Sequence, residues 1–308
     1  MSEVVLVTGG SGFIGTWVLR EVLHRGAKAV VVDVRPNPER WRRVLGGRAG
    51  EVVWAEASLT DPESLRAVVE RHSVSHVVHL AALLTPACQQ DPWLGCQVNV
   101  MGSMAVFEAV RRSGRAKSLA YASSYAVYGP ESGADADANR PTMFYGAFKQ
   151  AVDLIAEQYW RHFGIASVAV RPHVVFGPER EQGLTAGPSL AARAAATGAD
   201  FHIGYTGAAN YDYVEDVARA FVRSAFECPP GASVIDLKGE PATPEDFLRE
   251  IELAAPGGSA RLSVAGPPMP VSIPPNPNYI ENLFPDWQAT SLREGVAKTV
   301  HFYRKAGS

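Results

Sequence analysis

Short runs of consecutive apolar residues recur along the first half of the chain, separated by segments of helical character. The apolar runs are Val4–Val7, Ala29–Asp33, Val52–Ala55, Val77–Leu80, Ser118–Ala122 and Ala166–Arg171. Continuous runs of this length are typical of strands buried on both faces of a parallel sheet. The intervening helical segments include Phe13–Arg25, Pro62–Arg71 and Val98–Arg112. This alternation predicts an α/β fold of the Rossmann type, with a doubly wound parallel sheet.

The pattern changes in the second half, where Gly and Pro become frequent. One more strand is predicted at Ser233–Leu237 and a closing helix at Thr290–Tyr303, whereas Pro256–Pro277 is predicted to be mostly loop. We therefore expect one large domain over residues 1–175, with some later segments returning to it. Residues 176–308 are expected to form mostly a smaller C-terminal lobe.

Composition narrows the class of protein without identifying a site. Hydrophobic residues make up 46% of the 308 residues and charged residues 20%, which is enough to bury a core. The net charge of −3 and the lack of long like-charge runs argue against a nucleic-acid partner. The basic cluster is interpreted as a solvated helix face; it consists of Arg40, Arg42, Arg43 and Arg48.

The cysteines and apolar runs point to a cytoplasmic protein. The three cysteines, Cys88, Cys96 and Cys228, have neither zinc-site nor disulfide-framework spacing, so we expect reduced thiols and no metal. No signal-peptide pattern is recognisable, and no apolar run approaches the roughly 20 residues needed to span a bilayer.

A glycine-rich turn follows the first predicted strand and opens the first predicted helix. It reads Thr8-Gly9-Gly10-Ser11-Gly12-Phe13-Ile14-Gly15 and satisfies Gly-x-x-Gly-x-x-Gly from Gly9. Glycines let the backbone approach a pyrophosphate, and the helix N-terminus offers N–H groups to the anion. The second strand ends in Asp33, where a carboxylate binds the adenosine ribose and repels a 2′-phosphate. These residues predict NAD as the cofactor, although Arg35 could accept a 2′-phosphate.

Tyr145 and Lys149 stand four residues apart, after a strand that ends in Ser123-Ser124. On a helix both side chains would project from one face. A free tyrosine has a pKa near 10, and a neighbouring ammonium and an oxidised nicotinamide would both lower it. The pair therefore predicts a tyrosine that transfers protons.

Four motifs together give the chain a resemblance to a known family. They are the Thr8–Gly15 turn, His79–Ala82, Ser124–Gly129 and the Tyr145…Lys149 pair; Asn99–Gly102 matches a further segment. The chain resembles the extended short-chain dehydrogenase/reductases of the NAD-dependent epimerase/dehydratase family over nearly its whole length. The resemblance implies a dinucleotide-binding domain over residues 1–175 and a substrate-binding lobe over most of 176–308.

The resemblance also implies site residues. Ser124 would hydrogen-bond the reacting oxygen, Tyr145 would be the acid/base and Lys149 would hold the nicotinamide ribose. The implied cofactor-binding residues are Gly9, Gly12, Phe13, Ile14, Gly15, Asp33, Ser58, Leu59, Leu80, Ala81, Ala82, Asn99, Tyr145, Lys149, Pro172 and Val174. The implied substrate contacts are Thr85, Ser124, Tyr125, Tyr145, His173 and Arg180. Ser58 stands where the family often has an Asp that contacts adenine.

Two neighbours of Ser124 narrow the reaction. After the catalytic hydroxyl, family dehydratases typically carry Asp-Glu and decarboxylases carry a Glu at the second position, but this chain has Tyr125 and Ala126. Oxidation, reduction and epimerisation remain, because they need only a hydride and the tyrosine proton. A third hypothesis is a non-catalytic NAD-binding regulator. The presence of Ser124, Tyr145 and Lys149 argues against it.

The substrate is expected to be a small sugar, a sugar acid or another hydroxy or keto compound. Relatives that bind nucleotide sugars often place an Asn and an Arg on the nucleotide, where this chain has Val174 and Ala209. Replacement phosphate ligands would be Arg171, Arg180 or Arg193, which keeps a nucleotide-sugar epimerase, such as a UDP-sugar 4-epimerase, as the alternative. Neither nucleic acid nor a membrane is expected as a partner. A homodimer, paired through the helices beginning near Asn99 and Tyr145, is expected.

Overall fold

The computed structural model describes residues 3–129, 140–269 and 277–306 and divides the chain into two compact units. Unit 1 contains the described residues of Met1–Arg171, Ala218–Asp236 and Ser272–Tyr279. Unit 2 contains the described residues of Pro172–Val217, Leu237–Val271 and Ile280–Ser308. The glycine-rich turn and the Ser124, Tyr145 and Lys149 side chains all belong to unit 1.

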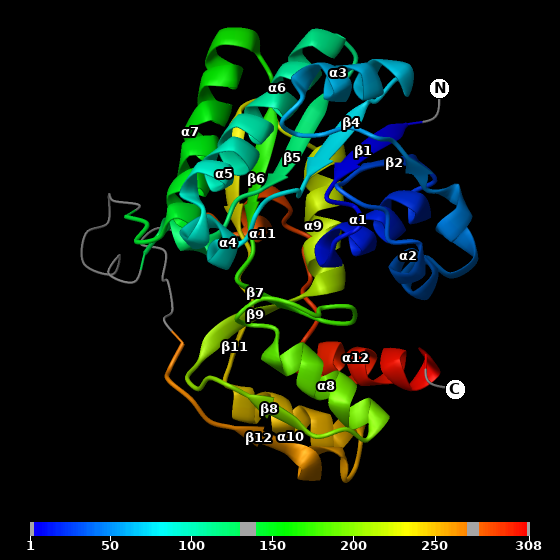
Figure 1. The fold of residues 1–308 in the computed structure, drawn as a ribbon, viewed down its shortest axis with the longest axis vertical. Coiled ribbons are helices and arrows are strands. Elements are labelled where there is room, and N and C mark those ends of the chain that lie inside the picture. Colours follow the sequence, from blue (N-terminus) through cyan, green and yellow to red (C-terminus); the bar gives the residue numbers. More distant parts are fainter. Residues whose placement is uncertain (1–2, 130–139, 270–276, 307–308) are drawn as a thin grey trace. The chain divides into compact units, whose positions relative to one another are not determined.

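Unit 1 is built on a seven-stranded parallel sheet with the order β10-β6-β5-β4-β1-β2-β3 (Figure 1). The strands are β1 (Val4–Thr8), β2 (Lys28–Val32), β3 (Val53–Trp54), β4 (His76–His79), β5 (Ser118–Ala122), β6 (Ser167–Arg171) and β10 (Ala232–Asp236). Strand order reverses between β1 and β4, and ligands of such sheets bind at the carboxyl ends of strands beside this switch point. The predicted Rossmann-type fold is confirmed.

Helices cover both faces of this sheet. They are α1 (Phe13–His24), α2 (Pro38–Leu45), α3 (Pro62–Arg71), α4 (Thr85–Gln90), α5 (Pro92–Cys96), α6 (Gly102–Ser113), α7 (Phe144–Phe163) and the part of α9 (Val214–Phe226) from Ala218 onward. Figure 1 shows α3, α6 and α7 on one face and α1 and α9 on the other. Helices α3, α6 and α7 bury Leu65, Phe107 and Val152, respectively, in one core with strand residues such as Leu119.

Local sequence explains where two of these helices begin and end. Asp61 caps α3 by accepting a hydrogen bond from the Ser64 amide, and Pro62 occupies the first position of the helix. Helix α7 ends at Gly164, whose positive φ of 67° suits a residue without a side chain. The predicted helix Val98–Arg112 is present, but its first turn is a π-helix, η2 (Gln97–Met101).

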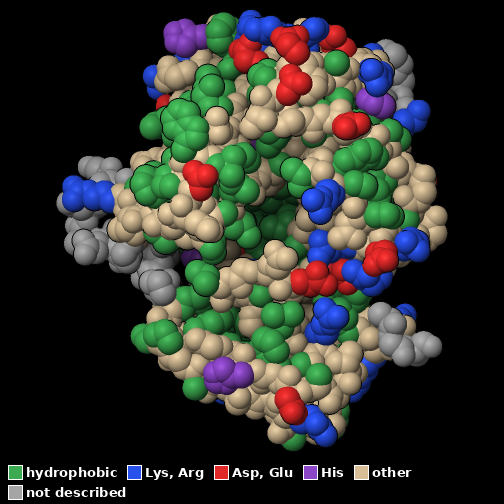
Figure 2. All heavy atoms as spheres, viewed as in Figure 1, with side chains coloured by type: hydrophobic (Ala, Val, Ile, Leu, Met, Phe, Trp, Pro, Cys, Tyr) green, Lys and Arg blue, Asp and Glu red, His purple; other side chains and the backbone are tan. Residues whose placement is uncertain are grey.

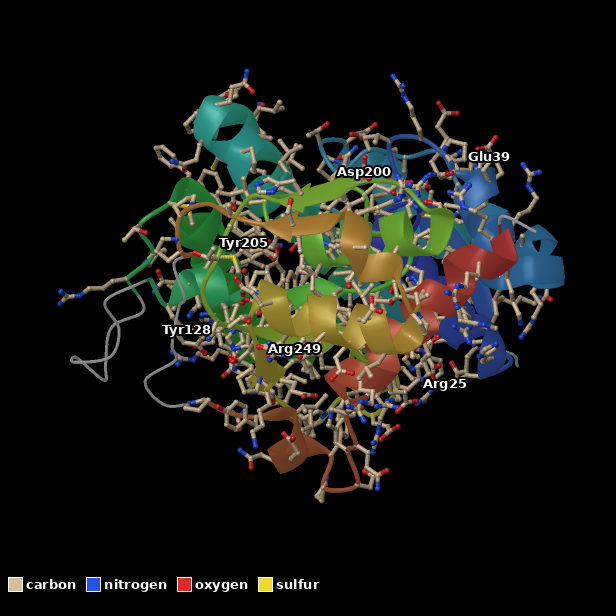
Figure 3. The ribbon with its side chains drawn as sticks, turned by 90° about the horizontal axis from the view of Figure 1, so that it is seen from below. Arg25, Glu39, Tyr128, Asp200, Tyr205 and Arg249 are labelled. Atoms are coloured by element: carbon tan, nitrogen blue, oxygen red, sulfur yellow. The ribbon has the colours of Figure 1, made fainter. Side chains whose placement is uncertain are left out.

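Unit 2 combines two small sheets with short helices. One sheet has the order β11-β9-β7 and the other β12-β8. The elements are β7 (Val174–Phe176), α8 (Gly187–Thr197), β8 (Phe201–Ile203), β9 (Ala209–Tyr213), β11 (Glu240–Ala242), α10 (Pro244–Ala254), η4 (Gly258–Arg261), β12 (Leu262–Val264), α11 (Ile280–Leu283) and α12 (Leu292–Ala306). Figure 3 shows side chains of this unit, with Tyr205 and Arg249 labelled. Its core contains Phe176, which packs edge-on against Tyr211 and Phe247.

Predictions for the second half had mixed outcomes. The strand near Ser233–Leu237 and the closing helix near Thr290–Tyr303 are confirmed as β10 and α12. The prediction that Pro256–Pro277 is mostly loop is wrong over Gly258–Val264, because β12 pairs in parallel with β8 there. Residues 270–276 of that segment lie outside the described residues.

Candidate active site

The glycine-rich turn leaves no space for side chains at two positions. An added Cβ on Gly15 would lie 2.0 Å from the Gly9 carbonyl oxygen, and one on Gly9 would lie 2.8 Å from the Ala81 backbone nitrogen. Gly9 also has a positive φ of 75°. Helix α1 begins immediately after Gly12, and among the described residues no side chain caps it. The turn therefore has the shape and the oriented N–H groups that bind a pyrophosphate, so this chain fits a dinucleotide.

Asp33 lies just beyond the end of β2, beside the turn. Its carboxylate accepts hydrogen bonds from the backbone amides of Ser11 at 2.9 Å and Val34 at 2.7 Å. Burial raises the pKa of Asp33, and the two amide bonds act in the opposite direction. Helix α2 supports the same turn, since Arg40 donates to the Ser11 carbonyl and Trp41 to the Gly10 carbonyl. Arg40, assigned from sequence to a solvated face, thus contacts the turn.

A buried histidine joins the glycine turn to the next strand of the sheet. The ring of His79 shares hydrogen bonds with Thr8 Oγ1 at 2.6 Å and Ser103 Oγ at 2.9 Å. The same Thr8 oxygen accepts from the Ala81 amide. Burial lowers the pKa of His79 to about 3, so its ring is neutral. Sequence reasoning used His79 only as part of a motif; this bridge was missed.

Other predicted cofactor residues lie along the strand ends of unit 1. Leu80, Ala81 and Ala82 follow β4 and are half-buried. The Asn99 side chain is buried and bonds both the amide and the carbonyl of Leu83, so it holds the segment after Ala82 in place. Its direct contact with a cofactor stays a prediction.

Two further candidates follow β3. Ser58 is exposed, and its hydroxyl lies 2.8 Å from the Thr60 hydroxyl in the turn before α3. Leu59 is half-buried beneath Gly102, where an added Cβ would lie 2.9 Å from the Leu59 Cβ. These positions leave both adenine contacts as predictions.

The three predicted catalytic side chains come from neighbouring elements. Ser124 follows β5 and caps the 3-10 helix η3 (Tyr125–Val127), while Tyr145 and Lys149 lie in the first two turns of α7. The Lys149 Nζ lies 5.6 Å from the centre of the Tyr145 ring and donates a 2.6 Å hydrogen bond to the Ala122 carbonyl. The predicted helical spacing of the Tyr and Lys is therefore present.

Burial dominates the ionisation of this group. It raises the pKa of Tyr145 to about 12, whereas a hydrogen bond with Ser124 acts to lower it. It lowers the pKa of Lys149 to about 8, with Asp153 acting to raise it. In the protein by itself, desolvation outweighs any lowering of the tyrosine pKa by the Lys149 charge. The lowering expected from an oxidised nicotinamide stays a prediction.

Two predicted substrate contacts also belong to unit 1. Thr85 is the first residue of α4 and is half-buried. Tyr125 is buried, with its ring edge-on to Tyr128 at 5.5 Å, so most of its surface is part of the core. Neither Tyr125 nor its neighbour Ala126 offers a carboxylate beside Ser124.

The remaining predicted contacts lie in unit 2. Pro172 and His173 precede β7, which begins with Val174. The His173 amide donates to the Asp212 carboxylate at 2.7 Å, and burial lowers the pKa of the His173 ring to about 3. Arg180 is half-buried and donates to the Val175 carbonyl and to the Thr185 hydroxyl.

Arg171 was one of three suggested replacement phosphate ligands, and the structure contradicts that suggestion. Its guanidinium is buried in unit 1 and donates to Ser123, Tyr128 and Asp153. A guanidinium enclosed in this way is unavailable to an incoming diphosphate. Arg193, by contrast, is paired with Glu181 in unit 2.

Within the described ranges, no group of three or more His, Cys, Asp or Glu side chains is placed to hold a metal ion. None of the described helices is long and apolar enough to cross a membrane.

Comparison with known proteins agrees with this geometry. UDP-glucose 4-epimerase of Mycolicibacterium smegmatis is 28% identical over 318 residues, which cover 97% of this chain and 98% of the relative. UDP-glucuronate 4-epimerase 4 of Arabidopsis thaliana is 31% identical over 185 residues, or 56% of this chain. The chain spans only 42% of the length of that second relative.

A solved structure and a family model extend the likeness. The UDP-glucose 4-epimerase of Thermus thermophilus, solved in complex with NAD, superposes with a TM-score of 0.80 at 26% identity, covering 98% of this chain and 99% of the other. The sequence model of the NAD dependent epimerase/dehydratase family matches residues 5–232. The glycine turn, the Rossmann sheet and these matches lead to one conclusion: the chain is an enzyme of the NAD dependent epimerase/dehydratase family.

Proposed function

We propose that this enzyme transfers a hydride between NAD and a hydroxylated carbon of a small sugar, sugar acid or other hydroxy or keto compound. The observation that carries the proposal is that the Ser124 side chain lies close enough to Tyr145 to lower the pKa of its phenol, with the Lys149 ammonium one helical turn away. Residues 1–175 would hold the dinucleotide, and most of 176–308 would select the substrate.

In the proposed mechanism each side chain has one task. When bound, NAD accepts or returns the hydride. Ser124 donates a hydrogen bond to the substrate oxygen and orients it toward Tyr145. The Tyr145 oxygen removes the hydroxyl proton during oxidation and returns it during reduction. The Lys149 ammonium favours the phenolate form of Tyr145 and holds the nicotinamide ribose.

Elimination and decarboxylation are less well supported. Both need a further acid or base beside Ser124, and the buried Tyr125 and the methyl group of Ala126 supply none. The remaining choice is between net oxidation or reduction and an epimerisation that returns the hydride.

The substrate class follows from two positions in unit 2. Ala209, aligned with the Arg that meets the diphosphate in nucleotide-sugar relatives, is buried in β9 and faces Ala242 of β11 across the pair. Val174, aligned with their Asn, has no hydrogen-bonding side chain. Because a diphosphate binds best to a bidentate arginine, these residues favour a smaller substrate.

A nucleotide-sugar 4-epimerase is the second candidate. The observation that favours it is the Mycolicibacterium smegmatis UDP-glucose 4-epimerase, whose similarity extends over 97% of this chain. In that case Arg180 and Arg193 of unit 2 would be the residues that bind the diphosphate.

One screen separates the two candidates. Purified enzyme is incubated with NAD and a panel of sugars, sugar acids, small hydroxy acids, UDP-sugars and dTDP-sugars. A dehydrogenase accumulates reduced nicotinamide, measured by absorbance, whereas an epimerase accumulates none and produces the epimer, measured by chromatography. Absence of both products from every substrate, with NAD bound, would favour the regulator reading and contradict the proposal.

We also propose a homodimer that pairs the helices beginning near Asn99 and Tyr145. Large apolar side chains are exposed on α7 and on α5, the short helix that leads directly into η2 at Gln97, and Figure 2 shows hydrophobic side chains gathered over α5 and α7. They are Trp93, Leu94, Phe144, Leu154, Trp160 and Phe163. Exposed apolar groups at this density are typical of surfaces that bind another protein.

A further inference from the structure

Behind the candidate catalytic residues, one buried carboxylate is shared by two other elements. Asp153, one turn after Lys149 on α7, accepts hydrogen bonds from the Ser123 hydroxyl at 2.8 Å and the Arg171 guanidinium at 2.5 Å. Arg171 ends β6 and also donates to the Ser123 oxygen at 3.2 Å. Asp153, Ser123 and Arg171 are all at least nine-tenths buried. The three bonds tie α7 to the ends of β5 and β6.

The network continues to the edge strand of the sheet. Arg171 donates to the Tyr128 hydroxyl at 2.6 Å, and that hydroxyl donates to the Asp236 carboxylate at 2.8 Å. Asp236 ends β10 and also accepts from the Asn278 amide. Tyr128, labelled in Figure 3, therefore connects the cation to a second buried carboxylate.

Lys149 brings a second buried cation beside this network. Lys149 and Asp153 are four residues apart on α7, and both bond the end of β5, the lysine at the Ala122 carbonyl and the carboxylate at the Ser123 hydroxyl. The Asp153 charge favours the charged form of the lysine. The other groups that face it are the Tyr145 ring on the same helix, the Ala122 carbonyl of β5, the neutral His79 of β4 and the Cys88 thiol of α4. Of these groups, Asp153 is the only carboxylic acid, and it is the main group favouring the charged lysine.

We propose that Asp153 is a positioning residue that keeps the Lys149 ammonium charged and the Ser123-Ser124 segment fixed, with Arg171 holding its carboxylate in place. The inference rests on the proposed function, in which Lys149 and Ser124 act on cofactor and substrate. A purely structural ion pair would explain the Arg171 contact. It would not explain why the same carboxylate also bonds Ser123, next to the catalytic serine, while Lys149, one turn earlier on α7, bonds the adjacent Ala122 carbonyl.

The direct test is the titration of Lys149 in protein without cofactor or substrate. The chain has six lysines, Lys28, Lys117, Lys149, Lys238, Lys298 and Lys305, so 13C-labelled lysine gives a tractable NMR spectrum. The Lys149 signal is assigned by its loss in Lys149→Arg. We expect a midpoint near the pKa of about 8 given above in the unmodified protein, and one lower by about 1 or more in Asp153→Asn, because a close opposite charge is removed.

Two variants serve as controls. Asp153→Glu keeps the charge and should restore the midpoint to near its original value. Glu157→Gln removes a carboxylate one turn further along α7, where Glu157 pairs with exposed Arg161, and should leave Lys149 unchanged. Asp153→Asn leaves Arg171 with one fewer acidic partner and is therefore destabilised. If it does not fold, Asp153→Asn combined with Arg171→Gln replaces both charges and should still lower the Lys149 midpoint.

The outcomes separate this inference from the proposed function. An unchanged Lys149 midpoint in the folded Asp153 variants would overturn the positioning role, whatever the enzyme catalyses. A lowered midpoint supports it even where no substrate is turned over. With a substrate in hand, the alkaline limb of the turnover profile should move to lower pH in Asp153→Asn together with the Lys149 titration, and should stay in place in Glu157→Gln.

Discussion

Tyr145 and Lys149 illustrate how burial acts on opposite charges at one place. Burial raises the pKa of the tyrosine to about 12 and lowers that of the lysine to about 8, so each side chain is moved toward its neutral form. Bound ligands and neighbouring charges must then favour the ionised forms at the moment of proton transfer. The chemistry of this site is therefore coupled to what is bound in it.

Tyr145→Phe tests the proton-transfer role. The phenyl ring keeps the packing of α7 but has no transferable proton, so turnover should fall by at least about a hundredfold, the usual range for loss of a general acid/base. The affinity for NADH, measured by fluorescence titration, should change little. Near-normal turnover in this variant would show that another group moves the proton.

Asp33 is expected to select NAD over NADP. Its carboxylate, held by the Ser11 and Val34 amides, would repel a 2′-phosphate. Fluorescence titrations should therefore show tighter binding of NADH than of NADPH by about tenfold or more, and Asp33→Ser should reduce that ratio. Arg35→Ala is the control and should leave the preference in place. If the unmodified protein bound NADH and NADPH equally well, Asp33 would not determine the cofactor preference, and Arg35 would be the expected determinant.

The neutral His79 should make the fold sensitive to acid. Its pKa is about 3 when folded and ordinarily near 6.5, so the unfolded chain binds a proton over this interval that the folded chain does not. Stability is thus lost as pH falls from about 6.5 toward 3, by up to about 1.4 kcal/mol per pH unit for this group. The Tm of His79→Gln should fall less steeply between pH 6.5 and 4.5 than that of the exposed control His162→Gln. Parallel curves would contradict this role.

At the scale of elements, the central sheet was predictable because its strands are buried on both faces. Runs such as Val4–Thr8 and Ser167–Arg171 are mostly apolar and buried along their whole length, so each strand can be predicted without its neighbours. Helix α3 was equally predictable, since Asp61 and Pro62 mark its start. The local sequence of each of these elements is enough to predict its secondary structure.

The elements that were missed depend on tertiary contacts. Strands β7, β8, β11 and β12 have three residues each, too few to show a period. The π-helix at Gln97–Met101 has no distinct residue pattern, and Asn99 within it bonds the distant Leu83 backbone. Sequence also pointed to Ser124, Tyr145 and Lys149, but it could not show that Asp153 and Arg171 meet behind them.

The exposed apolar surface of α5 and α7 predicts an association that substitution can disrupt. Trp93→Glu combined with Leu154→Glu places charges on both helices and should convert a dimer into a monomer, measured by light scattering at fixed concentration. Leu253→Glu is the control, since Leu253 is similarly exposed but lies on α10. A monomeric unmodified protein, or a double variant that still dimerises, would contradict the proposed interface.

At the scale of the whole molecule, substrate choice is assigned to the residues of unit 2. We expect nucleotide diphosphates to bind poorly at the substrate site, because Val174 and Ala209 replace an Asn and an Arg used by relatives. Loss of a charge-assisted phosphate contact weakens binding by on the order of one to two decades. Calorimetric titration of the NAD-loaded enzyme with UDP and dTDP should give a Kd weaker than about a millimolar. Micromolar binding of either would favour the nucleotide-sugar epimerase.

The pairing of β10 with β6 has a consequence for synthesis on the ribosome. Chains are made from the N-terminus, and domains begin to fold as they emerge. Until residues 232–236 are available, β6 is the open edge of a parallel sheet, and its backbone groups can pair with another nascent chain. The Tyr128 hydroxyl lacks its Asp236 acceptor over the same interval. The last strand of this sheet therefore closes the open edge beside β6 and supplies the Asp236 acceptor of the buried polar network, so both are completed only late in synthesis.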